Sequence, residues 1–74
     1  MDLLLEPPGA GLWAVEIKRS TAPAPSRGFH ESSADLRPTR RFIVYPGTER
    51  FPLGGGIEAI PLPDLANTLA AGGK

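Results

Sequence analysis

The sequence predicts an α/β fold, a small mixed sheet of about four strands with two helices packed on it. Three observations lead to this prediction. Apolar residues alternate in residues 12–18, they run without a break within residues 40–46, and helical spacing appears in two further segments. The chain has 74 residues, including 9 glycines and 9 prolines, and 41% of it is apolar. One small domain of marginal stability, spanning residues 1–74 with its core at about 2–71, is therefore expected.

A β-hairpin is expected at the start of the chain. Residues 2–6 (DLLLE) and 12–18 (LWAVEIK) are its strands, and the prolines and glycines of residues 7–11 connect them. Successive side chains of a strand point to opposite faces, so the second strand has two distinct sides. One side carries Trp13, Val15 and Ile17, and the other carries Leu12, Ala14, Glu16 and Lys18.

A crossover is expected in the middle of the chain. Residues 19–25 are irregular, because Pro23 and Pro25 hold the residues before them in extended conformations. A short helix follows from about Ser26 to Leu36, and Pro38 prevents its extension.

Residues 40–46 (RRFIVYP) have the strongest strand pattern in the chain. Their continuous apolar run predicts burial on both faces of a sheet, and Pro46 with Gly47 ends the strand in a turn. Because a helical segment separates this strand from residues 12–18, a right-handed crossover should pair the two strands in parallel.

The end of the chain is expected to hold a loop, a strand and a helix. The triple glycine at 54–56 is read as a flexible turn, residues 57–62 as a short strand, and Pro63 to about Ala71 as a helix that Gly72 ends. Residues 72–74 are expected to be disordered. One apolar helix face is expected from Leu62, Leu65 and Leu69.

The hairpin also predicts where acidic side chains meet. A connection that places Glu6 opposite Leu12 also places Asp2 opposite Glu16, on the same side of the sheet. Opposed Cβ atoms lie about 4.5–5.5 Å apart, so the two carboxylates repel unless a proton or a cation lies between them. Oxygen ligands favour a hard cation, Mg²⁺ or Mn²⁺. Lys18 follows on the same side, where its ammonium would hold a metal-bound water or stabilise charge on a phosphate.

A purely structural interpretation stands beside this one. Glu and Lys alternating with apolar residues is typical of any half-exposed strand, and a residue as near the N-terminus as Asp2 often frays. His30 is expected to be a surface or structural histidine, Trp13 a core residue, and Ser20 a phosphate contact or an organiser of its loop.

The charges sum to zero but are unevenly distributed. Residues 1–17 carry three acids and no base, residues 18–41 carry six bases and two acids, and residues 42–74 carry two bases and three acids. A basic middle segment suits a phosphate-bearing ligand, although a solvated mixed surface explains it as well. The candidate nucleic-acid contacts are Arg19, Ser20, Arg27, Arg40 and Arg41. Alternatively, Arg40 and Arg41 flank a buried strand and discourage edge aggregation.

The order Asp2, thirteen residues, then Glu16, Ile17 and Lys18 resembles the D…(D/E)XK signature of the PD-(D/E)XK, or restriction-endonuclease-like, superfamily. More narrowly, LWAVEIKRS, SRGFHE, RRFIVYPG, ERFPLGGGIEAIPL and the closing helix look like one prokaryotic family. That family is a C-terminal domain of unknown function attached to AAA-type ATP-binding proteins.

The resemblance implies a partial restriction-endonuclease-like core and specific roles for four residues. Asp2, Glu16 and the carbonyl of Ile17 would bind Mg²⁺ or Mn²⁺, and Lys18 would be the catalytic base or charge stabiliser. It also implies an ATPase domain normally in the same chain, and no phosphate-binding loop is present in these 74 residues. We therefore expect a C-terminal fragment of a larger protein, prone to self-association.

Several classes are excluded or left open. The absence of cysteine excludes a disulfide scaffold and a cysteine-bound zinc domain. The longest apolar run, about four residues, is far below the roughly 20 of a membrane helix, so a cytoplasmic protein is expected. Three functions remain: a metal-dependent nuclease-like module, a non-catalytic interaction or structural module of an ATPase, and an unrelated small β-rich binding module.

Overall fold

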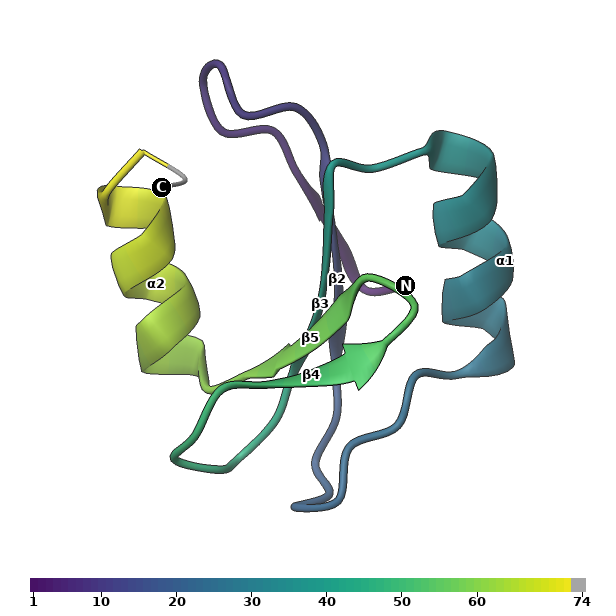
Figure 1. The fold of residues 1–74 in the computed structure, drawn as a ribbon, viewed down its shortest axis with the longest axis vertical. Coiled ribbons are helices and arrows are strands. Elements are labelled where there is room, and N and C mark those ends of the chain that lie inside the picture. The colour runs from purple at the N-terminus through teal and green to yellow at the C-terminus, as the bar shows by residue number, and fades with distance from the viewer. Residues whose placement is uncertain (73–74) are drawn as a thin grey trace.

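The fold has three layers, a five-stranded sheet with one helix on each face (Figure 1). The computed structural model describes residues 1–72, and the strand order is β1-β2-β3-β5-β4. The α/β prediction is confirmed, with five strands rather than about four. The elements are β1 Leu3–Leu5, β2 Trp13–Ile17, α1 Arg27–Leu36, β3 Arg40–Val44, β4 Phe51–Gly54, β5 Ile57–Ile60 and α2 Leu62–Ala70.

The hairpin forms in the predicted register. Strands β1 and β2 are antiparallel, with Leu4 opposite Ala14 at the centre of the pairing. The connection needs glycine at Gly11, whose φ is +74° and whose missing Cβ would lie 2.5 Å from the methyl group of Thr39. The turn therefore fixes the register on which the candidate site depends.

The predicted parallel pairing of residues 12–18 with 40–46 is also confirmed. Strand β2 pairs with β3 in parallel, from Trp13 opposite Arg40 to Ile17 opposite Val44. Helix α1 lies between them in the chain and ends at Arg37, which adopts a left-handed conformation with φ of 51° directly before Pro38.

Strand β3 continues the parallel part of the sheet by pairing with β5. Strand β4 was predicted as loop, but it pairs antiparallel with β5 at the edge of the sheet. The prediction failed because Pro52 and Gly54 disfavour a strand, whereas an edge strand tolerates proline, since one of its sides has no neighbour to bond. The triple glycine forms the β4–β5 turn, and all three residues have positive φ.

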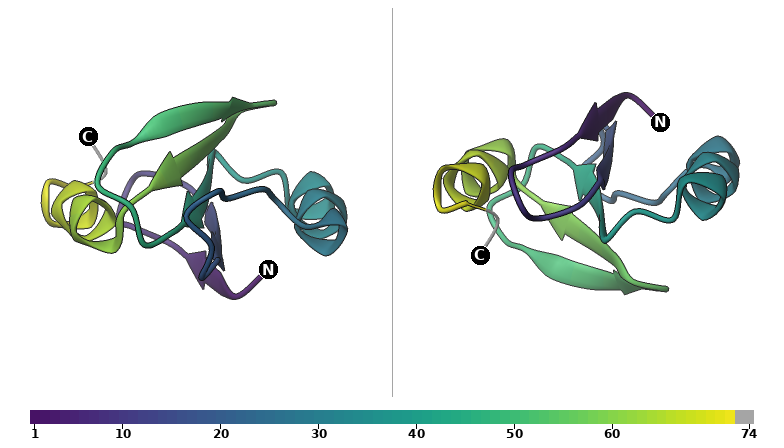
Figure 2. Two further views of the ribbon diagram at one scale, coloured as in Figure 1. Left: turned by 90° about the horizontal axis from the view of Figure 1, so that it is seen from below. Right: turned by 90° about the horizontal axis from the view of Figure 1, so that it is seen from above.

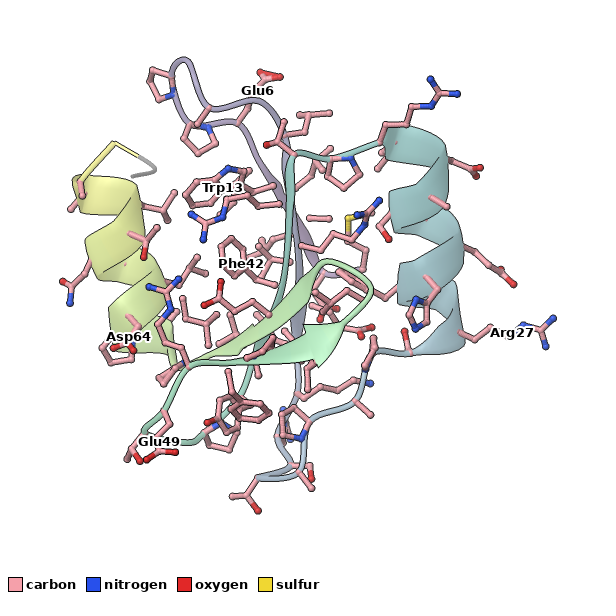
Figure 3. All side chains as sticks on the ribbon, viewed as in Figure 1. Glu6, Trp13, Arg27, Phe42, Glu49 and Asp64 are labelled. Atoms are coloured by element: carbon pink, nitrogen blue, oxygen red, sulfur yellow. The ribbon has the colours of Figure 1, made fainter. Side chains whose placement is uncertain are left out.

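Each face of the sheet has its own apolar core, and Figure 2 shows the two helices on opposite sides of the twisted sheet. The core on the α2 side combines Leu65 of that helix with sheet residues Trp13, Val15, Phe42, Val44 and Ile60, and the core on the α1 side combines Phe29 of that helix with Ala14, Ile43 and Ile57. The predicted alternation of β2 is thus confirmed, and Figure 3 shows Trp13 and Phe42 between the sheet and α2. Their rings are 5.3 Å apart at an angle of 60°.

The closing helix differs from its prediction at its first residue. It begins at Leu62, and Leu65 is buried while Leu69 packs against the core, but Leu62 is 62% exposed. Leu62 lies two residues beyond the end of β5, at the start of α2. At the other end, Gly72 donates its amide to the carbonyl of Leu69 at 3.0 Å. The rest of the tail predicted to be disordered, residues 73–74, lies outside the described residues.

The turn after β3 is closed by a tight contact. A Cβ added at Gly47 would lie 2.0 Å from the ring of Tyr45, so only glycine fits there. The hydroxyl of Tyr45 donates to the carbonyl of Glu49, and its ring meets Phe51 edge to face with centroids 5.7 Å apart. Tyr45 therefore packs against its own turn.

Candidate active site

Asp2 is hydrogen-bonded to β2 and is not frayed. Its amide donates to the carbonyl of Val15 at 3.0 Å, and its carboxylate Oδ2 accepts the amide of Ile17 at 2.7 Å. These two partners flank Glu16 in the chain, and the hairpin register, extended by one pair, sets Asp2 opposite Glu16. Both acids therefore belong to the face of the sheet that α1 covers.

Glu16 is buried, with 6% of its surface exposed, and it binds the start of α1. Its Oε2 accepts the amide of Ser26 at 3.0 Å, and its Oε1 accepts the hydroxyl of Ser26 at 2.6 Å. The same hydroxyl oxygen accepts the amide of Phe29 at 3.0 Å, which makes Ser26 the N-cap of α1. An anion at a helix N-terminus is favourable, so the Glu16 carboxylate has a fixed position.

Lys18 lies beside this carboxylate. Its Nζ is 3.9 Å from Glu16 Oε2, and the side chain is partly exposed. The amide of Lys18 donates to the carbonyl of Val44 at 2.8 Å, which extends the β2–β3 pairing beyond the last residue of β2. Backbone pairing thus holds the ammonium at the carboxyl end of the parallel strands. Ile17, between the two motif residues, supplies the amide that Asp2 binds.

The two carboxylates offer few ligands to a metal ion. Within residues 1–72, no group of three or more His, Asp or Glu side chains is placed to hold a metal ion. Mg²⁺ in proteins commonly takes one or two carboxylates and completes its shell with water and substrate phosphate. A carboxylate has about four lone-pair positions, of which Ser26 occupies two on Glu16. Among the described residues, hydrogen bonds reach Oδ2 of Asp2 and leave Oδ1 available.

An open depression of about 290 Å³ adjoins the site at the carboxyl ends of β2 and β3. In open α/β sheets this end of the parallel strands is where ligands bind. Lys18 lines the depression and also lies next to Glu16, but Ile17 and Val44 place the depression toward the α2 side of the sheet, whereas Glu16 lies on the α1 side. The depression is lined by Ile17, Lys18, Arg19, Val44, Tyr45, Pro46 and Leu62.

The proposed phosphate contacts divide into two groups by position. Arg19 and Ser20 are exposed and directly follow Lys18, so they lie at the site end of the sheet. The hydroxyl of Ser20 accepts the amide of Ala22 at 3.1 Å, which organises the loop. Arg27 lies at the start of α1, points away from the molecule in Figure 3, and forms an exposed ion pair with Glu31 at 3.1 Å.

Arg40 and Arg41 lie at the other end of the sheet. Arg40 is opposite Trp13, five residues and so about 16 Å before Lys18 along the strands. The expectation that these arginines protect a sheet edge was wrong, because β3 is the central strand, between β2 and β5. The strand pattern alone does not reveal how many neighbours a strand has.

Arg40 has a structural role inside the fold. Its guanidinium carbon lies 5.1 Å from the ring centroid of Trp13 and 4.7 Å from that of Phe42. Its Nη2 is 3.4 Å from Oε1 of Glu58, whose other oxygen accepts Nε of Arg50 at 2.6 Å. The hydrogen bond to Glu58 raises the pKa of Arg50 above its ordinary value. Glu58 thus joins two strands and the loop before β4.

Two further features were not anticipated as parts of the site. Ser26 was expected only to start a helix, although a serine three residues before the first buried helix residue is a signal for an N-cap. The depression combines residues from three separate segments, which no local pattern brings together. His30 is exposed on α1 and Trp13 is fully buried, as expected.

Comparisons with known proteins give a family and two relatives. Residues 1–65 match the family described as "Domain of unknown function (DUF4143)". Over 68 residues, or 92% of the chain, it is 38% identical to "Uncharacterized protein Mb2031c" of Mycobacterium bovis and equally to "Uncharacterized protein Rv2008c" of Mycobacterium tuberculosis. The match covers 15% of the length of each relative. No solved structure matches the chain. Within residues 1–72, no helix has the length and apolarity to span a membrane.

Proposed function

Because this chain belongs to the DUF4143 family, whose function is unknown, we propose a function from its site: a nuclease-like domain of the PD-(D/E)XK superfamily. Its reaction would be Mg²⁺- or Mn²⁺-dependent hydrolysis of a phosphodiester. The observation that carries this proposal is the hairpin register that sets Asp2 opposite Glu16, with Lys18 Nζ 3.9 Å from the Glu16 carboxylate. The resemblance of these residues to the D…(D/E)XK signature supports it.

The proposed roles follow from the position of each group. Asp2 and Glu16 would hold the ion, with the carbonyl of Ile17 as a third ligand. The ion would polarise the phosphate and lower the pKa of a bound water. Lys18 would stabilise the negative charge that builds on the phosphate, or would accept the proton of the attacking water. Ser26 keeps the Glu16 carboxylate in place through two hydrogen bonds, so it is a positioning residue.

The nucleic-acid contacts are proposed in order of their distance from this site. Arg19 and Ser20 adjoin Lys18 and would contact the reacting phosphate and the one next to it. Arg27, Arg40 and Arg41 lie farther away, so contacts to them require a substrate that extends around α1 or across the sheet.

A second candidate is a non-catalytic interaction or structural module of an AAA-type ATP-binding protein. It is favoured by the hydrogen bonds of the acids themselves, because Glu16 binds Ser26 with both oxygens and Asp2 binds the amide of Ile17. In that case the carboxylates stabilise the fold without an ion. The chain spans only 15% of its curated relatives, and an ATPase region elsewhere in a longer protein is part of this second proposal.

A Mn²⁺ titration followed by ¹⁵N NMR tests the first candidate against the second. At substoichiometric Mn²⁺, paramagnetic broadening that is strongest at Asp2, Glu16, Ile17 and Lys18, falls with distance from them and is lost in Glu16→Gln is the result expected for a metal site. The matched control is Glu31→Gln, since Glu31 is an exposed acid on α1 and should leave the broadening unchanged. Broadening centred on another part of the domain, or none at millimolar Mn²⁺, would refute the nuclease-like site and favour the interaction module.

A further inference from the structure

The depression beside the site has apolar walls and two cations. Ile17 is 50% exposed and Leu62 is 62% exposed, and both side chains line it. Val44 and Tyr45 are buried beneath the surface, so they contribute only parts of their side chains to the floor. Lys18 and Arg19 supply positive charge, and the Lys18 ammonium also lies 3.9 Å from the Glu16 carboxylate. Apolar surface left open next to paired cations indicates a ligand with one apolar part and one anionic part.

Such a ligand is a nucleotide whose base is accessible. A base has a flat apolar face, and its phosphate carries the negative charge that Lys18 and Arg19 complement. Inside a duplex the base faces are covered by their stacked neighbours, so a protein reaches them only when the nucleotide is unpaired or extruded. An apolar depression next to a phosphate site therefore selects for an unpaired nucleotide.

We propose that the domain binds single-stranded nucleic acid, with one unpaired base in the depression and the adjoining phosphate at Lys18 and Arg19. The assignment of that phosphate to the reacting position rests on the proposed function, whereas the base contact does not. Lys18 lines the depression and lies 3.9 Å from Glu16, so a strand that passes over Lys18 at the carboxyl end of β2 would have its base on the α2 side of the sheet and its phosphate beside the acids on the α1 side. An acidic peptide would match the same charges, and it enters below as an alternative outcome.

Fluorescence anisotropy in EDTA tests this proposal without cleavage and without a metal. Four fluorescein-labelled probes are compared. They are a single-stranded oligodeoxynucleotide, the oligoribonucleotide of the same sequence, a duplex hairpin of equal charge, and the deoxy strand with abasic nucleotides at its centre. We expect the intact single strands to bind at least about fivefold more tightly than the hairpin and the abasic strand, since each base contact is worth at least that factor. The deoxy and ribo arms show which sugar is preferred.

Two neutral substitutions locate the base contact. Leu62→Gln and Ile17→Gln should weaken single-strand binding about fivefold or more and should abolish the difference between intact and abasic strands. Leu4→Gln is the matched control, because Leu4 is 47% exposed on β1 and does not line the depression. ¹⁵N spectra of each variant verify its fold, and the abasic comparison needs no variant.

Four results would overturn the proposal. These are equal binding of intact and abasic strands, equal effects of Leu62→Gln and Leu4→Gln, no binding of any strand, or tight binding of a polyglutamate peptide that excludes nucleic acid. Failure of the proposed metal site is distinguishable from failure of this proposal. A protein that shows no Mn²⁺ broadening would still bind intact strands more tightly than abasic strands in EDTA.

Discussion

Glu16 binds Ser26 with both of its carboxylate oxygens, one to the backbone amide at 3.0 Å and one to the hydroxyl at 2.6 Å. The acid belongs to the second strand of the sheet and the serine caps α1, so one side chain joins the hairpin to the helix that covers it. The residue proposed to bind an ion is therefore also a structural connection, and each role can be tested separately.

Removing the hydroxyl of Ser26 should destabilise the domain. Ser26→Ala loses the N-cap of α1 and leaves one oxygen of a buried carboxylate without its partner, which together cost about 2–4 kcal/mol in the free energy of unfolding. Urea denaturation followed by circular dichroism measures the change. Ser32→Ala is the control on the same helix and should be nearly neutral; an equal loss in both variants would contradict the role of the cap.

Removing the ammonium of Lys18 should separate catalysis from metal binding. In Lys18→Ala, nicking of supercoiled plasmid should fall at least about 100-fold, since the charge that stabilises the phosphate under attack is lost. Mn²⁺ affinity should remain nearly unchanged, because the two carboxylates are intact. Arg37→Asn, which removes an exposed cation at the end of α1 and tolerates the left-handed conformation there, should nick normally. A Lys18→Ala protein that nicks at the full rate would count against the mechanism.

Neutralising Asp2 should weaken metal binding while the hairpin stays folded. In Asp2→Asn the amide oxygen still accepts the backbone amide of Ile17, so stability should change by less than about 1 kcal/mol. We expect the Mn²⁺ affinity to fall at least about tenfold with the loss of one anionic ligand. Isothermal titration calorimetry measures the Mn²⁺ affinity of Asp2→Asn and of the control Asp35→Asn, which neutralises an acid on α1. Unchanged affinity in Asp2→Asn would show that Asp2 is not a ligand.

The isolated chain should self-associate or unfold in mild denaturant. Strand β1 is an edge strand with exposed leucines at positions 3 and 4, and such edges pair with other chains. Leu4→Lys should shift the chain toward the monomer in sedimentation equilibrium, because a charged edge strand resists pairing. Leu36→Lys, which places a charge on an equally exposed helix position, should not. A wild-type monomer with a high urea midpoint would show that this expectation is wrong.

Much of the fold follows from local patterns. The hairpin register could be predicted because a five-residue connection and a period of two leave few alternatives, and the crossover because a helix separates two apolar strands. Strand β4 could not, since Pro52 and Gly54 are tolerated only because the strand lies at an edge. The position of a strand in the sheet depends on the tertiary fold. For the same reason, the expectation that Arg40 and Arg41 protect a sheet edge was wrong, since β3 lies between β2 and β5.

Only the part of the site that lies on the hairpin could be predicted from the sequence. The placement of Asp2 opposite Glu16 and of Lys18 beside it follows from strand geometry. The bond from Ser26 to Glu16 could not be predicted, because it depends on how α1 docks after an irregular proline-containing loop. The depression likewise requires the start of α2 to meet the ends of β2 and β3.

The contact between Gly47 and the ring of Tyr45 has a consequence for sequence variation. A side chain at position 47 can be accommodated only if the aromatic ring at position 45 is lost or displaced, so substitutions at the two positions should occur together across species. An alignment in which alanine or serine at 47 coexists freely with tyrosine at 45 would mean that the backbone of this turn differs among its members.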